Sequence, residues 1–142
     1  MVLGDADGSM VRDLLSTTEL RIITLLADAT AVKELQNKLM QQGMYGHRVT
    51  VWQHEESTSL PFSHGIFNVV MESVQTQYET TDLLDLVAPE TGFLWRADSD
   101  TPVRPPATEG AGVWRHQYAN PANTSATEDK LVGSATAFRL LW

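Results

Sequence analysis

The sequence predicts an α/β domain built on a doubly wound, mostly parallel sheet. Two features of residues 1–98 lead to this prediction. Short runs of leucine and β-branched residues alternate with stretches in which apolar side chains recur at helical spacing. Serine, threonine, glycine and proline separate these runs, as they do where helices begin and end. Alternation of this kind indicates parallel strands joined by helical crossovers, with helices on both faces of the sheet.

Three strands and two helices are predicted in the first part of the chain. Ser9 is suited to cap the first helix, and Gly43 stands near the end of the second. The unbroken run "LRIITLLAD" is typical of a strand that is buried on both faces. Strand, helix, strand, helix and strand are predicted, in this order, at residues 1–3, 9–18, 20–28, 29–46 and 48–55.

A fourth strand, a third helix and a fifth strand are predicted next. The crossover that leads into the fourth strand is too short for a helix of the usual size. Pro89 and Gly92 are expected to stop the third helix. The three elements are predicted at residues 65–74, 80–92 and 93–98. Residues 99–112, which hold three prolines and two glycines, are predicted to be a linker to a separate segment at residues 113–142.

The turn after the first strand is the first candidate site. Gly4 and Gly8 enclose Asp5, Ala6 and Asp7. Ligands of open α/β sheets bind at the carboxyl ends of the strands, and glycines there let the backbone approach a cofactor. The two aspartates leave two alternatives open, because they can cap the following helix or reach an amino group of the cofactor.

Acidic side chains are predicted at the same edge of the sheet. Asp28 closes the second strand, twenty residues after Gly8. A carboxylate at this place can accept hydrogen bonds from ribose hydroxyls, although a solvated strand end explains it as well. Glu55 and Glu56 close the third strand. The sequence therefore predicts a glycine turn and carboxylates around one nucleotide-like ligand.

At these positions residues 1–98 resemble the class I S-adenosylmethionine-dependent methyltransferases. "VLGDADG" is similar to the first motif of that family, with Ala6 where a middle glycine is usual, and "FNVVMESV" is similar to its fourth strand. The resemblance implies a Rossmann-like sheet of strand order 3-2-1-4-5 and S-adenosylmethionine as the cofactor. It implies that the cofactor-binding residues are Gly4, Asp5, Ala6, Gly8, Asp28 at the ribose and Glu56 near the adenine.

The sequence also departs from that family. Val2 stands where an acidic residue usually precedes the first glycine, and Asn68 stands where the fourth strand often has an aspartate. The final antiparallel strand pair is not recognisable after residue 98, so we expect a fold truncated at its C-terminal strands. Such a truncation leaves an open sheet edge, through which two copies of the chain could pair as a homodimer.

The C-terminal segment carries a second resemblance. "WRHQYANPANT" and "LVGSATAFRLLW" are similar to the lead-in to pyrroloquinoline-quinone-type β-propeller repeats of planctomycete-like bacterial proteins. No propeller blade follows in this sequence, so no quinone site is implied. The resemblance implies that the chain is a piece of a larger quinoprotein-like protein.

Two functions follow from these resemblances. The first is an S-adenosylmethionine-dependent methyltransferase-like domain with an unknown methyl acceptor and unknown catalytic residues. Alignment of acceptor, methyl group and sulfur is the main requirement of methyl transfer, so a conspicuous catalytic residue is not needed. The second is a non-catalytic module of degenerate sequence that serves as an interaction or scaffold domain. A piece of a nicotinamide-dependent dehydrogenase fits less well, because the turn lacks its middle glycine.

The composition of the chain limits the classes of partner that we expect. The chain has 142 residues, a net charge of −8 and no cysteine. An acidic chain without a basic stripe does not attract nucleic acid, so we predict no nucleic-acid partner. No apolar run suits a membrane span and no signal-peptide pattern is present. We therefore expect a cytoplasmic chain as it stands, and an exported one if it belongs to a larger signal-bearing protein.

The four histidines lack the spacing of metal ligands, and no metal site is predicted. His54 next to Glu55 and Glu56 could form a two-ligand cluster, but a strand end that faces solvent explains the same residues. His64 could act as a general base near a bound substrate or be a polar loop residue.

Overall fold

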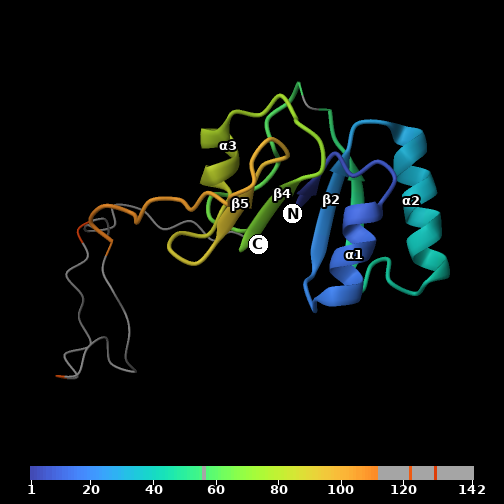
Figure 1. Ribbon diagram of the computed structural model, residues 1–142, viewed down its shortest axis with the longest axis horizontal. Helices are drawn as coiled ribbons and strands as arrows, with labels where there is room; N and C mark the ends of the chain where they lie inside the picture. The colour runs from blue at the N-terminus through green and yellow to red at the C-terminus, as the bar shows by residue number, and fades with distance from the viewer. Residues whose placement is uncertain (56, 112–121, 123–129, 131–142) are drawn as a thin grey trace, which may run out of the picture. The chain divides into compact units, whose positions relative to one another are not determined.

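A computed structural model describes residues 1–55, 57–111, 122 and 130 (Figure 1). The chain divides into two compact units, Met1–Pro106 and Ala107–Trp142, and all named helices and strands belong to the first. They are β1 (Val2–Leu3), α1 (Ser9–Thr17), β2 (Ile22–Leu26), α2 (Ala29–Gln41), β3 (Val49–Gln53), β4 (Val69–Glu72), α3 (Thr80–Asp85) and β5 (Phe93–Trp95). In the second unit, the backbone amide of Lys130 donates to the carbonyl of Gly110 at 2.8 Å.

The five strands form one sheet of order β3-β2-β1-β4-β5, and every neighbouring pair is parallel. The predicted fold class and strand order are therefore confirmed. β1 is the central strand, with Val2 in register with Thr24 of β2 and with Met71 of β4. Because all strands run the same way, the segments that follow them meet at one carboxyl edge.

Each face of the sheet has its own core. Side chains from alternating strand positions, such as Val2, Ile22 and Val51, pack with α1 and α2. The intervening positions, such as Leu3 and Leu25, pack with α3 and with the connection between β3 and β4. Figure 1 shows α1 and α2 together and α3 apart from them. The alternation follows from the period of two along a strand.

Several elements are shorter than predicted. α2 ends at Gln41, and Gly43 follows in a left-handed conformation with φ of 69°, which turns the chain toward β3. α3 ends at Asp85 rather than near Pro89. The residues after it bridge to Phe67, since the amide of Phe67 donates to the carbonyl of Leu86 at 2.9 Å. This pairing replaces the last helical turns.

The predicted linker begins with a segment that pairs with the sheet. Leu94 and Val103 form an antiparallel bridge, with both N–O distances at 2.8 Å. The Arg104 guanidinium adds hydrogen bonds to the carbonyls of Thr91 and Gly92 and lies 5.9 Å from the ring centroid of Phe93. The edge of β5 is thus occupied at Leu94 by the chain itself. The predicted segment 113–142 lies outside the described residues, except for residues 122 and 130.

Candidate functional site

The glycine turn lies where it was predicted, between β1 and α1 at the carboxyl edge. Both glycines have left-handed backbones, with φ of 74° at Gly4 and 71° at Gly8. A Cβ on Gly4 would lie 2.5 Å from Cγ2 of Val74, and a Cβ on Gly8 would lie 2.5 Å from Cδ1 of Leu35. The left-handed backbone therefore favours glycine at both positions, and at Gly4 the methyl group of Val74 also leaves little room for a Cβ.

The aspartates of the turn bind the start of α1. Asp5 is fully buried, and its two carboxylate oxygens accept from the backbone amides of Met10 at 3.2 Å and Val11 at 2.8 Å. Asp7 is exposed and accepts from the amide of Ser9 at 2.9 Å and from its hydroxyl at 2.8 Å. The amide and then the hydroxyl of Ser9 hold the pKa of Asp7 below its usual value. Helix capping, the first of the two alternatives, thus accounts for both carboxylates.

Asp28 lies at the same edge, just after β2, and caps α2. Its Oδ1 accepts from the backbone amide of Ala31 at 2.7 Å. Its side chain is exposed, and Oδ2 makes no hydrogen bond to the part of the chain that the structure describes. One oxygen of this carboxylate therefore supports the fold while the other can accept from a ligand. Ala6, at the tip of the turn, is exposed as well.

The end of β3 is followed by His54 and by Glu55, which is exposed, while Glu56 lies outside the described residues. The ring of His54 stacks on that of Tyr78, with centroids 6.4 Å apart and an interplanar angle of 20°. The two residues follow β3 and β4 respectively, so the stack joins two loops of the carboxyl edge. Residues 1–55 and 57–111 contain no group of three histidine or carboxylate side chains placed to hold a metal ion.

A buried ion pair at this edge was not predicted from the sequence. Nε of Arg96, after β5, lies 3.0 Å from Oε2 of Glu72 at the end of β4, and the two residues are 9% and 2% exposed. The other oxygen of Glu72 accepts from the amide and the hydroxyl of Thr76. Nη1 of Arg96 donates to the carbonyl of Tyr78 at 3.1 Å and to the hydroxyl of Thr80 at 3.3 Å. The pair therefore fixes the loop between β4 and α3.

A signal for this pair was present in the sequence. Glu72 ends β4 and Arg96 directly follows β5, and the predicted strand order places these two strands side by side. Two opposite charges at the same edge of neighbouring strands can form an ion pair. His64 is not part of this edge network. Its Nδ1 lies 3.7 Å from a carboxylate oxygen of Asp85, and both side chains are largely exposed.

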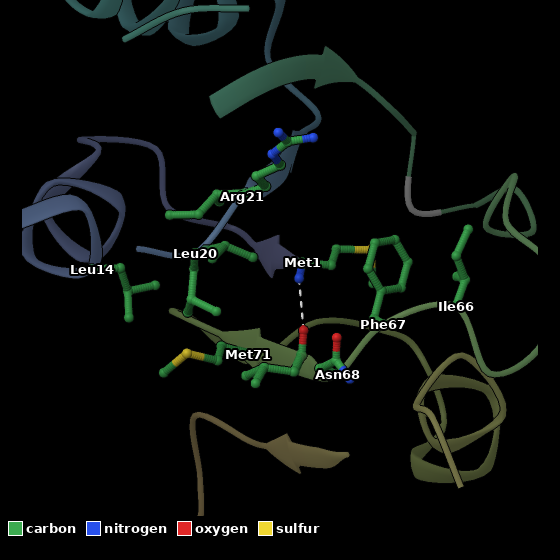
Figure 2. A pocket seen from close by; sticks show the side chains of 11 residues that line it. Met1, Leu14, Leu20, Arg21, Ile66, Phe67, Asn68 and Met71 are labelled. Atoms are coloured by element: carbon green, nitrogen blue, oxygen red, sulfur yellow. Dashed lines mark hydrogen bonds between the residues drawn. The ribbon is translucent and has the colours of Figure 1, made fainter. Parts of the chain in front are cut away.

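A cavity of about 150 Å³ lies at the opposite edge, where β1, β2 and β4 begin (Figure 2). The amino group of Met1 faces it and donates to the carbonyl of Val69 at 2.7 Å. Burial lowers the pKa of this amino group from 8.0 to about 5. The cavity is lined mainly by apolar side chains, with Arg21 and Asn68 as the polar ones. It is remote from the glycine turn, since the two lie at opposite ends of the strands.

Comparison with solved structures gives the same fold. No protein-family model matches this sequence, and no curated protein matches it significantly. A protein from Galdieria sulphuraria assigned as a sarcosine dimethylglycine methyltransferase has a TM-score of 0.57 and 15% identity, covering 66% of this chain and 36% of its own. Geranyl diphosphate methyltransferase in complex with S-adenosylmethionine has a TM-score of 0.56 and 11% identity, covering 66% and 40%. The cyclase SpnF has a TM-score of 0.55 and 17% identity, covering 66% and 35%.

These similarities show the fold of the chain. The chain spans between 35% and 40% of the length of these three proteins. Proteins with different activities share the fold, so the residues of the site have to carry the argument for function. Within the described ranges, the helices are too short or too polar to cross a membrane.

Proposed function

We propose that this chain is a methyltransferase-like domain that binds S-adenosylmethionine at the carboxyl edge of its sheet. The observation that carries the proposal is the carboxylate of Asp28, which keeps Oδ2 available beside the glycine turn. β1 is also the strand from which the connections turn to either side of the sheet, which is where open α/β sheets bind their ligands. Solved methyltransferases of the same fold support the choice of cofactor.

Each predicted site residue has a part in this proposal. Gly4 and Gly8 shape the turn, and Ala6 is exposed at its tip, where the backbone would approach the cofactor. Asp5 would contribute by holding the turn in its conformation, because both of its carboxylate oxygens accept from backbone amides of α1. Asp28 accepts from a ribose hydroxyl. Glu56 is proposed to lie near the adenine, as the resemblance implies.

The bound cofactor would supply an electrophilic methyl group on a positively charged sulfur. Asp28 and the glycine turn would hold the cofactor, and the chain would contribute mainly by aligning the acceptor with the methyl group.

Calorimetric titration of S-adenosylmethionine tests the proposal. Asp28→Asn is the informative variant, because the side-chain oxygen of asparagine still caps α2 while its amide group cannot accept from a hydroxyl. We expect binding to weaken about tenfold or more, for the loss of roughly one charged hydrogen bond. Asp13→Asn changes the same charge on the exposed surface of α1 and should bind as the parent chain does. Equal binding by the parent and Asp28→Asn chains would contradict the role of Asp28.

A non-catalytic interaction or scaffold module is the second candidate. It is favoured by Val74, which fills the space next to Gly4, and by the complete use of the Asp5 carboxylate in helix capping. Val2, in place of the usual acid, favours it too. Under this candidate the chain belongs to a quinoprotein-like protein, as the second resemblance implies. Absence of heat at millimolar S-adenosylmethionine, with the chain folded, would favour this candidate.

A further inference from the structure

A cavity of about 460 Å³ lies between α3 and the connection from β3 to β4. It is on the face of the sheet that α3 covers, and part of its wall comes from the loops that follow β3 and β4. Figure 1 shows this connection, without a helix, passing beside α3. A crossover between parallel strands usually carries a helix that packs on the sheet. The connection from β3 to β4 has no helix, and the cavity lies beside it.

Part of the cavity lining, here called its floor, is apolar, whereas seven of its eleven lining residues are polar. Phe62 stacks on Trp52 with ring centroids 5.7 Å apart. It also makes a T-shaped contact with Phe67, with ring centroids 4.9 Å apart. Leu60, Leu86 and the half-buried ring of Tyr78 complete the floor. A volume of this size and an aromatic floor are typical of sites for small organic molecules.

The rim of the cavity is acidic. Asp82 and Asp85 lie three residues apart on α3, so that their side chains share one side of the helix. No lysine or arginine lines the cavity. Asp82 makes no hydrogen bond or ion pair with a described residue, and Asp85 pairs with His64 at 3.7 Å.

Asp85 is also poorly placed for the stability of α3. It is the last residue of the helix, where the free carbonyl groups make a carboxylate unfavourable. A cation bound at this point would offset that repulsion. The faces of aromatic rings attract ammonium groups as well.

We infer that this cavity binds an organic amine with a flat apolar body. The ammonium group would lie between Asp82 and Asp85, and the apolar body would rest on Phe62 and Leu86. The inference does not depend on methyl transfer, because the cavity and its rim are formed without the glycine turn or Asp28. A chain that fails to bind S-adenosylmethionine can still bind the amine.

Nuclear magnetic resonance titration of the full chain tests this inference, with phenethylamine as the probe and phenethyl alcohol as its neutral match. We expect phenethylamine to cause saturable shifts of backbone amides in residues 57–60 and 82–86. The alcohol should bind about tenfold more weakly, because it lacks the charge. This comparison uses the unchanged chain, so it does not depend on any variant folding.

Variants then test the two carboxylates. Asp82→Asn and Asp85→Asn should each weaken phenethylamine binding several-fold and leave the alcohol unaffected, whereas Asp13→Asn should change neither. Three results would overturn the inference: equal affinity for the amine and the alcohol, unchanged amine binding in both α3 variants, or an absence of saturable shifts around the cavity.

Discussion

The amino group of Met1 gives a prediction whose size follows from the structure. It lies at the start of the central strand and donates to the carbonyl of Val69 at 2.7 Å. A neutral amine also has N–H groups that can donate this hydrogen bond. Burial lowers its pKa from 8.0 to about 5. Between these two values the unfolded chain binds a proton that the folded chain does not bind. Stability therefore rises with pH through this window.

The expected penalty can be calculated. Each pH unit in the window lowers the free energy of unfolding by about 1.4 kcal/mol, so the full penalty below pH 5 is about 4 kcal/mol. It is about 3 kcal/mol near pH 6, about 1 kcal/mol near pH 7, and close to zero above pH 8. These figures apply to a chain that retains Met1 as its first residue, which mass spectrometry can verify.

The matched control is a chain with Gly-Ser added before Met1. Its Met1 nitrogen is an amide that can still donate to Val69 and does not titrate, and the cavity of Figure 2 leaves room beside it. Urea unfolding followed by circular dichroism gives the free energy of unfolding of both chains between about pH 5.5 and pH 8.5. The two chains differ only in the added residues, so contributions that they share cancel in the difference. That difference should grow by about 2–3 kcal/mol from pH 8.5 to pH 6. A difference that stays constant over this range would refute the reasoning.

Two further predictions concern the carboxyl edge. Gly4→Ala should destabilise the chain by about 1–3 kcal/mol, since alanine is strained at φ of 74° and its Cβ would lie 2.5 Å from Val74. Val74→Ala added to it should recover part of the loss in thermal unfolding, and no recovery would mean that the backbone strain alone matters. Arg96→Met should cost about 3–5 kcal/mol because it leaves Glu72 buried without its partner. The double variant with Glu72→Gln should lose less than Arg96→Met alone, and an equal or larger loss would contradict the pairing.

The fold was predictable because each local signal agreed with the parallel sheet. The unbroken apolar run gave the buried strand β2, and Gly43 marked the end of α2 through its left-handed backbone. The length of α3 was not predictable from its own residues. Its last turns are replaced by the bridge from Phe67 to Val87, a contact between segments twenty residues apart in sequence. The pairing of Val103 with Leu94 depends on the same kind of distant contact.

The site was predictable only in part. Sequence position alone placed Gly4, Gly8 and Asp28 at the carboxyl edge, because parallel strands end together. It could not show that Val74 packs against Gly4, since that contact depends on how the loop after β4 folds back. The ion pair of Glu72 and Arg96 was within reach of the same logic that found Asp28.

The local structure determines which substitution can distinguish between the two proposed functions. Gly4 and Gly8 are favoured by their left-handed backbones whether or not a cofactor binds, and Asp5 is occupied by the amides of α1. Substituting any of them disturbs the fold, so a loss of binding there would not distinguish a contact from a collapse of the turn. Asp28 differs, because Oδ1 serves the helix and Oδ2 is not engaged by any described residue. Asp28→Asn keeps the first role and removes the second, so its effect on S-adenosylmethionine binding reports on the ligand rather than on the fold.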